Sequence, residues 1–236
     1  MWRISRRNVR GRSRRVGAFG LTSSIILAQC FGSVSGADKG EEVLQMTVAI
    51  LAGGESRRMG RDKAALLFGG LSLLERTART ALSAGLMVLV AGRARPDDWP
   101  MPAVDFVPDA APGRGPLGGL ETALKHTGGP VLAVACDMPL LTSEALVWLR
   151  DRAAASTSEH GLAVLNDGQW EPLFSVYAPA CLPLIEIRLA AGRLSLHGLI
   201  EAGDFARADA PGWVTSQLIN INTPEELRRL SGIIPL

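Results

Sequence analysis

The sequence predicts an α/β fold with a mainly parallel central sheet, and three observations favour it. From residue 46 onward, short apolar runs alternate with segments of helical periodicity. The apolar runs have almost no polar interruption, as in 86–91 and 130–136, which is typical of parallel strands covered on both faces. Glycines and charged residues follow the ends of several runs, where the ligands of such sheets bind.

In chain order, the first strand is expected at 47–51, where an apolar run ends in a glycine turn. A helix is expected at 72–84, because i, i+3 and i+4 spacing places one set of side chains on a single face: Leu73, Leu74, Thr77, Ala78, Ala81 and Leu82. Apolar runs predict the next strands at 86–91 and 104–107. The following helix is expected at 117–127, with two glycines where it begins.

The second half of the chain continues the alternation. Its apolar runs predict strands at 130–136, 161–165, 172–177 and 217–221. Helices are expected at 143–155, 180–191, 195–203 and 224–231. Pro139 prevents the 130–136 strand from continuing in the sheet. At the last helix, Thr223 is the expected N-cap, Pro224 the first helical residue and Glu226 the capping-box partner.

The first 45 residues differ in composition from the rest. They are rich in arginine from Arg3 to Arg15 and then apolar and small from Val16 to Ala28, which resembles a signal peptide. The apolar stretch is too short and too interrupted to span a bilayer. We expect residues 1–45 to be an unstructured extension, or translation to begin at Met46, and residues 46–236 to form a single domain without a membrane partner.

Composition excludes several classes of protein. The formal net charge is +2, but residues 1–45 hold eight of the 25 basic and three of the 23 acidic residues, so the remainder carries −3. No basic stripe with stacking aromatics is present, so a nucleic-acid partner is not expected. Three dispersed cysteines and three dispersed histidines have no metal-ligand spacing, which predicts a reducing, cytoplasmic location and no structural zinc.

The segment 51–63 has the character of a phosphate-binding loop. Gly53 and Gly54 allow a tight turn that exposes backbone N–H groups, and four cations follow within seven residues: Arg57, Arg58, Arg61 and Lys63. The spacing excludes a Walker A loop, because Arg61 and Asp62 stand between the second glycine and the lysine. The segment predicts a nucleoside-triphosphate site, and the alternative is a basic surface loop.

A second glycine-rich segment covers 109–120. Gly118 and Gly119 are expected to open the positive end of a helix to a ligand, and Asp109 follows a strand. The spacing Gly113-x-Gly115-x-x-Gly118, with Asp137 about twenty residues later, also matches a dinucleotide fingerprint. This allows an NAD-dependent oxidoreductase as an alternative, although residues 108–112 separate the fingerprint from its strand.

Two later segments place polar groups at strand ends. Asp137, within Cys136-Asp137-Met138-Pro139, is a single carboxylate between phosphate loops, which suits Mg²⁺. The alternative role for Asp137 is to cap the following helix. Asn220 and Asn222 remain as candidate substrate contacts once Thr223, Pro224 and Glu226 are explained by the helix start.

Together these segments resemble the molybdenum cofactor guanylyltransferases, which are relatives of the nucleotide-sugar pyrophosphorylases. The family's L-A-G-G-x-S-x-R-M-G-x-D-K stands at 51–63, G-P-L-x-G-[LM] at 115–120, C-D-x-P at 136–139 and N-x-N-T-P-E-E-L at 220–227. The resemblance implies a Rossmann-like, three-layer nucleotidyltransferase fold. It also implies transfer of GMP from GTP to molybdopterin with Mg²⁺, release of pyrophosphate, and cofactor-biosynthesis proteins and recipient molybdoenzymes as partners.

The resemblance also implies roles for individual residues. Leu51, Ala52, Gly53 and Gly54 would line the nucleotide, with Asp109 and Gly118 beside it. Lys63 and Arg58 would neutralise the phosphates, and Asp137 would carry Mg²⁺. Cytidylyl relatives typically have L-A-A-G where this chain has L-A-G-G, which favours guanine. Where the guanylyl family offers an asparagine after the second strand, this chain has Ala91-Gly92-Arg93.

Three other functions stay open at this point. The first is a cytidylyltransferase or another nucleotidyltransferase of the same superfamily. The second is the NAD-dependent oxidoreductase using Gly113–Gly118. The third is a nucleotide-binding module without catalysis, which intact residues at 51–63 and 136–139 make less favourable.

Overall fold

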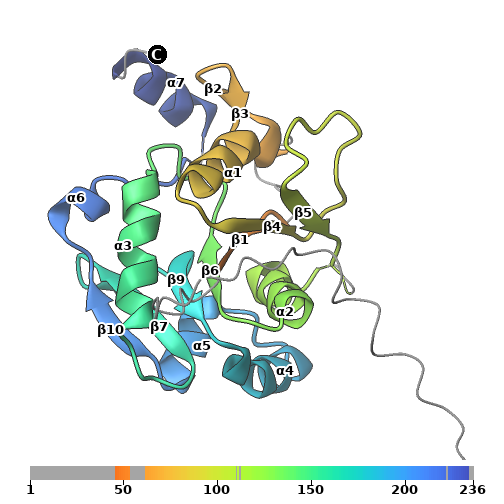
Figure 1. The fold of residues 1–236 in the computed structure, drawn as a ribbon, viewed down its shortest axis with the longest axis vertical. Coiled ribbons are helices and arrows are strands. Elements are labelled where there is room, and N and C mark those ends of the chain that lie inside the picture. Colours follow the sequence, from red (N-terminus) through yellow and green to blue (C-terminus); the bar gives the residue numbers. More distant parts are fainter. Residues whose placement is uncertain (1–45, 54–61, 110, 112, 222, 234–236) are drawn as a thin grey trace, which may run out of the picture. The chain divides into compact units, whose positions relative to one another are not determined.

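The computed structural model describes residues 46–53, 62–109, 111, 113–221 and 223–233. Its central feature is an eight-stranded sheet of order β10-β7-β9-β6-β1-β4-β5, with β8 paired to β7, beside the two-stranded ribbon β2-β3 (Figure 1). The strands are β1 Thr47–Leu51, β2 Leu67–Phe68, β3 Leu71–Ser72, β4 Met87–Ala91, β5 Val104–Val107, β6 Val131–Val134, β7 Gly161–Asn166, β8 Gln169–Trp170, β9 Phe174–Tyr177 and β10 Ala206–Asp209.

Helices precede and follow the strands along the chain. They are the 3-10 turn η1 Lys63–Ala65, α1 Leu73–Ser83, α2 Gly115–Thr127, α3 Ser143–Ala154, the 3-10 turn η2 Pro179–Cys181, α4 Leu182–Ala190, α5 Leu196–Ala202, α6 Gly212–Thr215 and α7 Pro224–Ile233. Among the described residues, no helix has the length and apolar character needed to cross a bilayer.

The sheet is covered on both faces, which gives three layers (Figure 1). Along β1, Val48 and Ile50 point to one face and pack in a core with α1 and α3. Ala49 and Leu51 point to the other face and pack in a second core with α2, α4 and α5. This alternation follows from the pleat of the strand, so a run that is apolar at every position is buried on both sides.

Four of the seven strand pairs in the eight-stranded sheet are parallel, including β10 with β7. β1 pairs in parallel with β4 and β6, and β4 with β5, whereas β9 runs antiparallel between β6 and β7. The predicted mainly parallel sheet and the Rossmann-like, three-layer α/β fold are therefore confirmed.

The chain changes direction at β1. It leaves β1 through α1 on one face to reach β4, and it returns from β5 through α2 on the opposite face to reach β6. Strand order therefore reverses between β4 and β6, with β1 at the reversal (Figure 1). In open α/β sheets such a switch point opens a crevice at the carboxyl ends of the strands, where ligands bind.

The structure corrects several expected elements. The predicted strand at 217–221 is wrong: this segment follows α6 as a turn, and Ile221 N donates to Asp137 O at 2.9 Å. It cannot join the sheet beside β6, because β1 and β9 already occupy both edges of that strand. Strand β10 was missed because its sequence, Ala-Arg-Ala-Asp, lacks the apolar run used to predict strands.

Candidate active site

Three strand ends meet at a contact between two glycines. Gly53 follows β1, Gly92 follows β4 with φ of 96°, and Asp109 lies two residues beyond β5. A Cβ atom on Gly53 would lie 2.8 Å from Asp109 Oδ2 and 3.0 Å from Gly92 Cα, and a Cβ on Gly92 would lie 2.6 Å from Gly53 N. Both positions therefore require glycine for the backbones to approach this closely.

Asp109 is fixed beside this contact by the neighbouring helix. Its Oδ1 accepts a hydrogen bond from Thr122 Oγ1 in α2 at 3.2 Å, while Oδ2 faces Gly53. Backbone hydrogen bonds extend the strand pairing beyond the strands, from Ala52 N to Ala91 O and from Gly92 N to Val107 O. The structure thus brings Ala52, Gly53 and Asp109 together, as expected for parts of one site.

Lys63 and Asp137 come together from distant parts of the chain. Lys63 is the first residue of η1, and its Nζ lies 3.3 Å from Asp137 Oδ2, beyond the end of β6. The same Nζ donates to Ile221 O at 3.2 Å. The side chains of Lys63 and Asp137 are 23% and 19% exposed, so both remain accessible to a ligand. A cation and a carboxylate therefore stand together at the edge of the sheet where the neighbouring strands β1 and β6 end.

The surroundings of Asp137 suit a Mg²⁺ ion that takes few of its ligands from the protein. Within the described parts of the chain, no three His, Cys, Asp or Glu side chains are grouped so as to hold a metal ion. Asp137 therefore offers one partly exposed carboxylate rather than a protein cage. Mg²⁺ in nucleotide enzymes is commonly bound this way, through one or two carboxylates, substrate phosphates and water.

Cys136 lies directly before Asp137 and is buried. Burial, together with the negative charges of Asp137 and Asp62, raises the pKa of the Cys136 thiol to about 12, although the Arg93 charge opposes the shift. A thiol with this pKa stays protonated near neutral pH. A thiolate nucleophile at Cys136 is therefore disfavoured in the folded protein.

The predicted start of the helix at 117–127 needs correction. The helix begins at Gly115, so Gly118 is its fourth residue and not its start. A Cβ on Gly118 would lie 2.6 Å from Arg114 Cβ, which means that this glycine makes room for a neighbouring side chain. Gly118 also lines a hollow of about 510 Å³ with Val107, Pro108 and Thr122, next to Asp109.

Two of the remaining predicted site residues, Leu51 and Asn220, are described by the structure. Leu51 is buried at the end of β1, and Asn220 is exposed immediately before Ile221. Gly54, Arg57, Arg58, Arg61 and Asn222 lie outside the described residues.

Glu171 was missed by sequence reasoning. It directly follows β8, and burial together with the charge of Asp137 raises its pKa, while a hydrogen bond with Asn166 opposes the shift. No motif marks it, because it stands next to a segment that reads simply as a strand.

The chain is similar in sequence to a known family and to individual members of it. Residues 48–206 match the MobA-like NTP transferase domain family. A probable molybdenum cofactor guanylyltransferase of Deinococcus radiodurans is 35% identical over 192 residues, which cover 80% of this chain and 96% of the relative. A molybdenum cofactor guanylyltransferase of Rhizobium meliloti is 33% identical over 200 residues, covering 79% of this chain and 90% of the relative.

Solved structures show the same fold. Molybdopterin-guanine dinucleotide biosynthesis protein A from Archaeoglobus fulgidus superimposes with a TM-score of 0.65 at 24% identity, covering 80% of this chain and 98% of that one. A 4-diphosphocytidyl-2C-methyl-D-erythritol synthase from Anaerococcus prevotii gives 0.56 at 13% identity, covering 81% and 99%. At these identities the likeness concerns the fold alone.

Proposed function

Because the chain belongs to the MobA-like NTP transferase family, we propose that it transfers GMP from GTP to molybdopterin, forming the guanine dinucleotide cofactor and releasing pyrophosphate. The observation that carries this proposal is the approach of Lys63 to Asp137 at the edge of the sheet where β1 and its parallel neighbour β6 both end. These are the residues that a nucleotidyltransferase needs at its triphosphate.

The nucleoside is assigned to the glycine contact. Gly53 and Gly92 bring the ends of β1 and β4 close together, and the Asp109 carboxylate beside them accepts a hydrogen bond from Thr122 Oγ1. Guanine has N1–H and N2–H₂ donors next to the O6 acceptor. A surface that combines carboxylate and carbonyl acceptors with backbone N–H donors matches this pattern, and unmet hydrogen bonds reject other bases. Leu51 and Gly54 are assigned to the nucleotide by their places in the family motif at 51–63.

The triphosphate is assigned to Lys63, with Arg58 as a second cation. A bound nucleotide would draw the Lys63 ammonium from its partners Asp137 and Ile221 O toward the phosphates. Asp137 would then hold Mg²⁺, which when bound neutralises phosphate charge and orients the leaving pyrophosphate.

The chemistry needs no general base from the protein. The acceptor is itself a phosphate, which is ionised near neutral pH and already nucleophilic. Lys63 and Arg58 would stabilise the charge that develops at the α-phosphate, and the rigid strand ends would align two polyanions for attack. The protonated Cys136 thiol is consistent with a mechanism that has no covalent enzyme intermediate.

The expected cellular location and partners of the enzyme follow from its substrates. We place the enzyme in the cytoplasm, where GTP is available, with cofactor-biosynthesis proteins supplying the pterin and molybdoenzymes receiving the product. Nucleic acid and membrane are not expected partners. Residues 46–236 would form the catalytic domain, and Asn220 and Asn222 are proposed to contact substrate.

The test uses the full chain with Mg²⁺, molybdopterin and GTP, CTP, ATP or NAD(H) in separate reactions. Pyrophosphate and a guanine dinucleotide product should form only when GTP and molybdopterin are both present. Lys63→Ala should lose this activity, and Arg79→Ala, in an exposed ion-paired arginine on α1, should keep it. Binding of GTP without any product would indicate a non-catalytic module, and NAD(H) binding would indicate the oxidoreductase.

A further inference from the structure

Arg93 and Asp62 form an ion pair across the candidate site. Arg93 lies two residues beyond β4, and Asp62 directly precedes η1. Arg93 Nη2 lies 2.5 Å from Asp62 Oδ2, although 31 residues separate the two positions. The Arg93 side chain is only 25% exposed, so the guanidinium is partly enclosed where it meets the carboxylate.

The same carboxylate also caps the turn that carries Lys63. Asp62 is the N-cap of η1, and its Oδ1 accepts a hydrogen bond from Ala64 N at 3.0 Å. One oxygen of Asp62 therefore binds the turn and the other binds Arg93. Because Lys63 is the first residue of that turn, the direction in which its side chain leaves the backbone depends on this carboxylate.

Lys63 completes the series of contacts. Its Nζ reaches Asp137 Oδ2 at 3.3 Å and Ile221 O at 3.2 Å. A continuous set of contacts thus runs from the end of β4, through the start of η1, to the end of β6.

We propose that Arg93 is a positioning residue for Lys63 and acts through the Asp62 carboxylate. The proposal rests on the proposed function, since it assigns to Arg93 the task of setting Lys63 for the triphosphate. Exposed ion pairs contribute little to folding. A displaced catalytic or binding group, however, can cost about a hundredfold in rate for a shift of about 1 Å. Loss of Arg93 should therefore reduce activity far more than stability.

A double-mutant cycle on Arg93 and Lys63 separates positioning from direct contact with the nucleotide. Arg93→Ala and Asp62→Ala should each lower kcat/KM for GTP by about tenfold or more, while Arg93→Lys should restore part of it. GTP affinity, measured by calorimetry, completes the cycle, because Lys63→Ala lacks turnover. Arg93→Ala alone should weaken GTP binding several-fold, but in a Lys63→Ala background it should cost almost no further GTP affinity, because the group it positions is gone. Additive effects would overturn the proposal.

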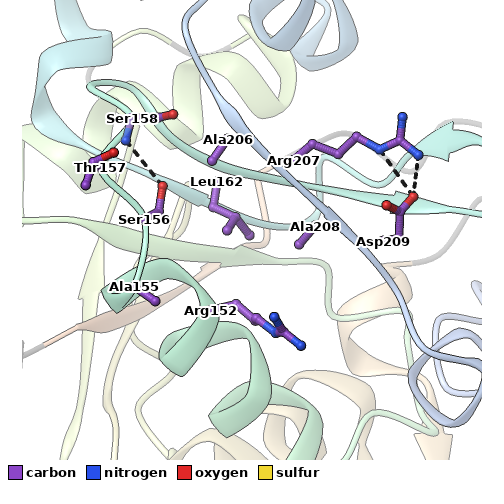
Figure 2. Close-up of a pocket in the computed structure, with 10 residues that line it drawn as sticks. All are labelled: Arg152, Ala155, Ser156, Thr157, Ser158, Leu162, Ala206, Arg207, Ala208 and Asp209. Atoms are coloured by element: carbon purple, nitrogen blue, oxygen red, sulfur yellow. Dashed lines mark hydrogen bonds and ion pairs between the residues drawn. The ribbon is translucent and has the colours of Figure 1, made fainter.

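The chain offers a matched control in a second arginine–aspartate pair. Arg207 Nη2 lies 2.5 Å from Asp209 Oδ1 on the edge strand β10 (Figure 2). This pair borders a hollow of about 520 Å³ lined also by Arg152 and the 155–158 segment, which includes no residue of the candidate site. Arg207→Ala should leave kcat/KM for GTP unchanged. An equal loss in Arg207→Ala would show that the effect of Arg93→Ala is not specific.

A second measurement does not depend on turnover. Acetylation of Lys63 by a lysine-specific reagent, followed by mass spectrometry, reports how firmly the ammonium is held. Its rate should rise several-fold in Arg93→Ala, while the rate at Lys125 stays constant. An unchanged Lys63 rate would overturn the proposal. If the rate rises but the parent chain does not use GTP, the positioning stands and the proposed function fails.

Discussion

The Lys63 ammonium lies 3.3 Å from the Asp137 carboxylate, although 74 residues separate them in the sequence. Topology explains the approach. β1 and β6 are parallel neighbours, so the segments that follow them begin at the same edge of the sheet. Lys63 is held there by η1, and Asp137 by the hydrogen bond between its carbonyl oxygen and Ile221 N.

Substitution of Lys63 and substitution of Asp137 should impair the enzyme in different ways. Lys63→Ala should weaken GTP binding, because loss of a charged partner commonly costs about 2–5 kcal/mol. Asp137→Asn should keep much of the GTP affinity, but Mg²⁺ should no longer stimulate its turnover. Calorimetric titration of GTP with and without Mg²⁺ distinguishes the two. Near-parental activity of Asp137→Asn would contradict the metal assignment.

Gly53→Ala should damage the nucleotide site. The new methyl group would lie 2.8 Å from Asp109 Oδ2 and 3.0 Å from Gly92 Cα, so the strand ends must separate. We expect a loss of at least about tenfold in GTP affinity, because the surface that contacts the nucleoside is displaced. Gly212→Ala serves as the control, since nothing lies within 4 Å of its added Cβ. Equal GTP affinity in the two variants would refute the placement of the nucleoside.

Glu171→Gln should stabilise the protein at neutral pH. The folded state raises the pKa of Glu171 above its ordinary value of 4.5, chiefly by burial. Its contribution to stability is therefore fully present below that ordinary value and is lost as pH rises through the raised pKa. The Tm of Glu171→Gln should exceed that of the parent at pH 7, and the gap should narrow toward pH 4.

Glu144→Gln should change Tm in the opposite direction in the same experiment. Hydrogen bonds from its own backbone N–H, Thr142 and Ser143 lower the pKa of Glu144 at the start of α3. Its contribution is present above the ordinary value and is lost as pH falls, so Glu144→Gln should lower Tm at pH 7. A change of Tm in the same direction for Glu171→Gln and Glu144→Gln at pH 7 would contradict the environments described for the two residues.

Cys136 and Cys181 should resist alkylation in the folded protein. Burial raises both thiol pKa values to about 12, and the thiolate is the reactive form. At pH 8, iodoacetamide should modify both residues much more slowly in buffer than in guanidinium chloride, as measured by mass spectrometry. Fast labelling of Cys136 in buffer would show that the strand end beside Asp137 opens.

Sequence patterns were sufficient where local chemistry decides structure. The capping box is present as predicted, with Thr223 N donating to Glu226 Oε2 at 3.2 Å and Glu226 N donating to Thr223 Oγ1 at 3.1 Å. Strand β1 and the turn at Gly53 also follow from a local apolar run and a glycine. Such features need no knowledge of distant residues.

Features that depend on tertiary neighbours were not predictable. The 217–221 segment is apolar enough for a strand, but no sheet edge is open to it beside β6. The closeness of Gly53 to Gly92 and of Arg93 to Asp62 depends on the order of β1 and β4 in the sheet. The motifs identify Lys63 and Asp137 individually, whereas their contact is a property of the fold.

The measurement that tests the central claim most directly is a competition between GTP and CTP. The full chain would be incubated with molybdopterin, Mg²⁺ and equal concentrations of both nucleotides, and the dinucleotide products identified by mass. Hydrogen-bonded sites can reject a base that leaves polar groups unpaired by factors of about 10⁴. We predict a guanine product in excess of at least about a hundredfold. A predominantly cytosine product would contradict the assignment and place the chain among cytidylyltransferases.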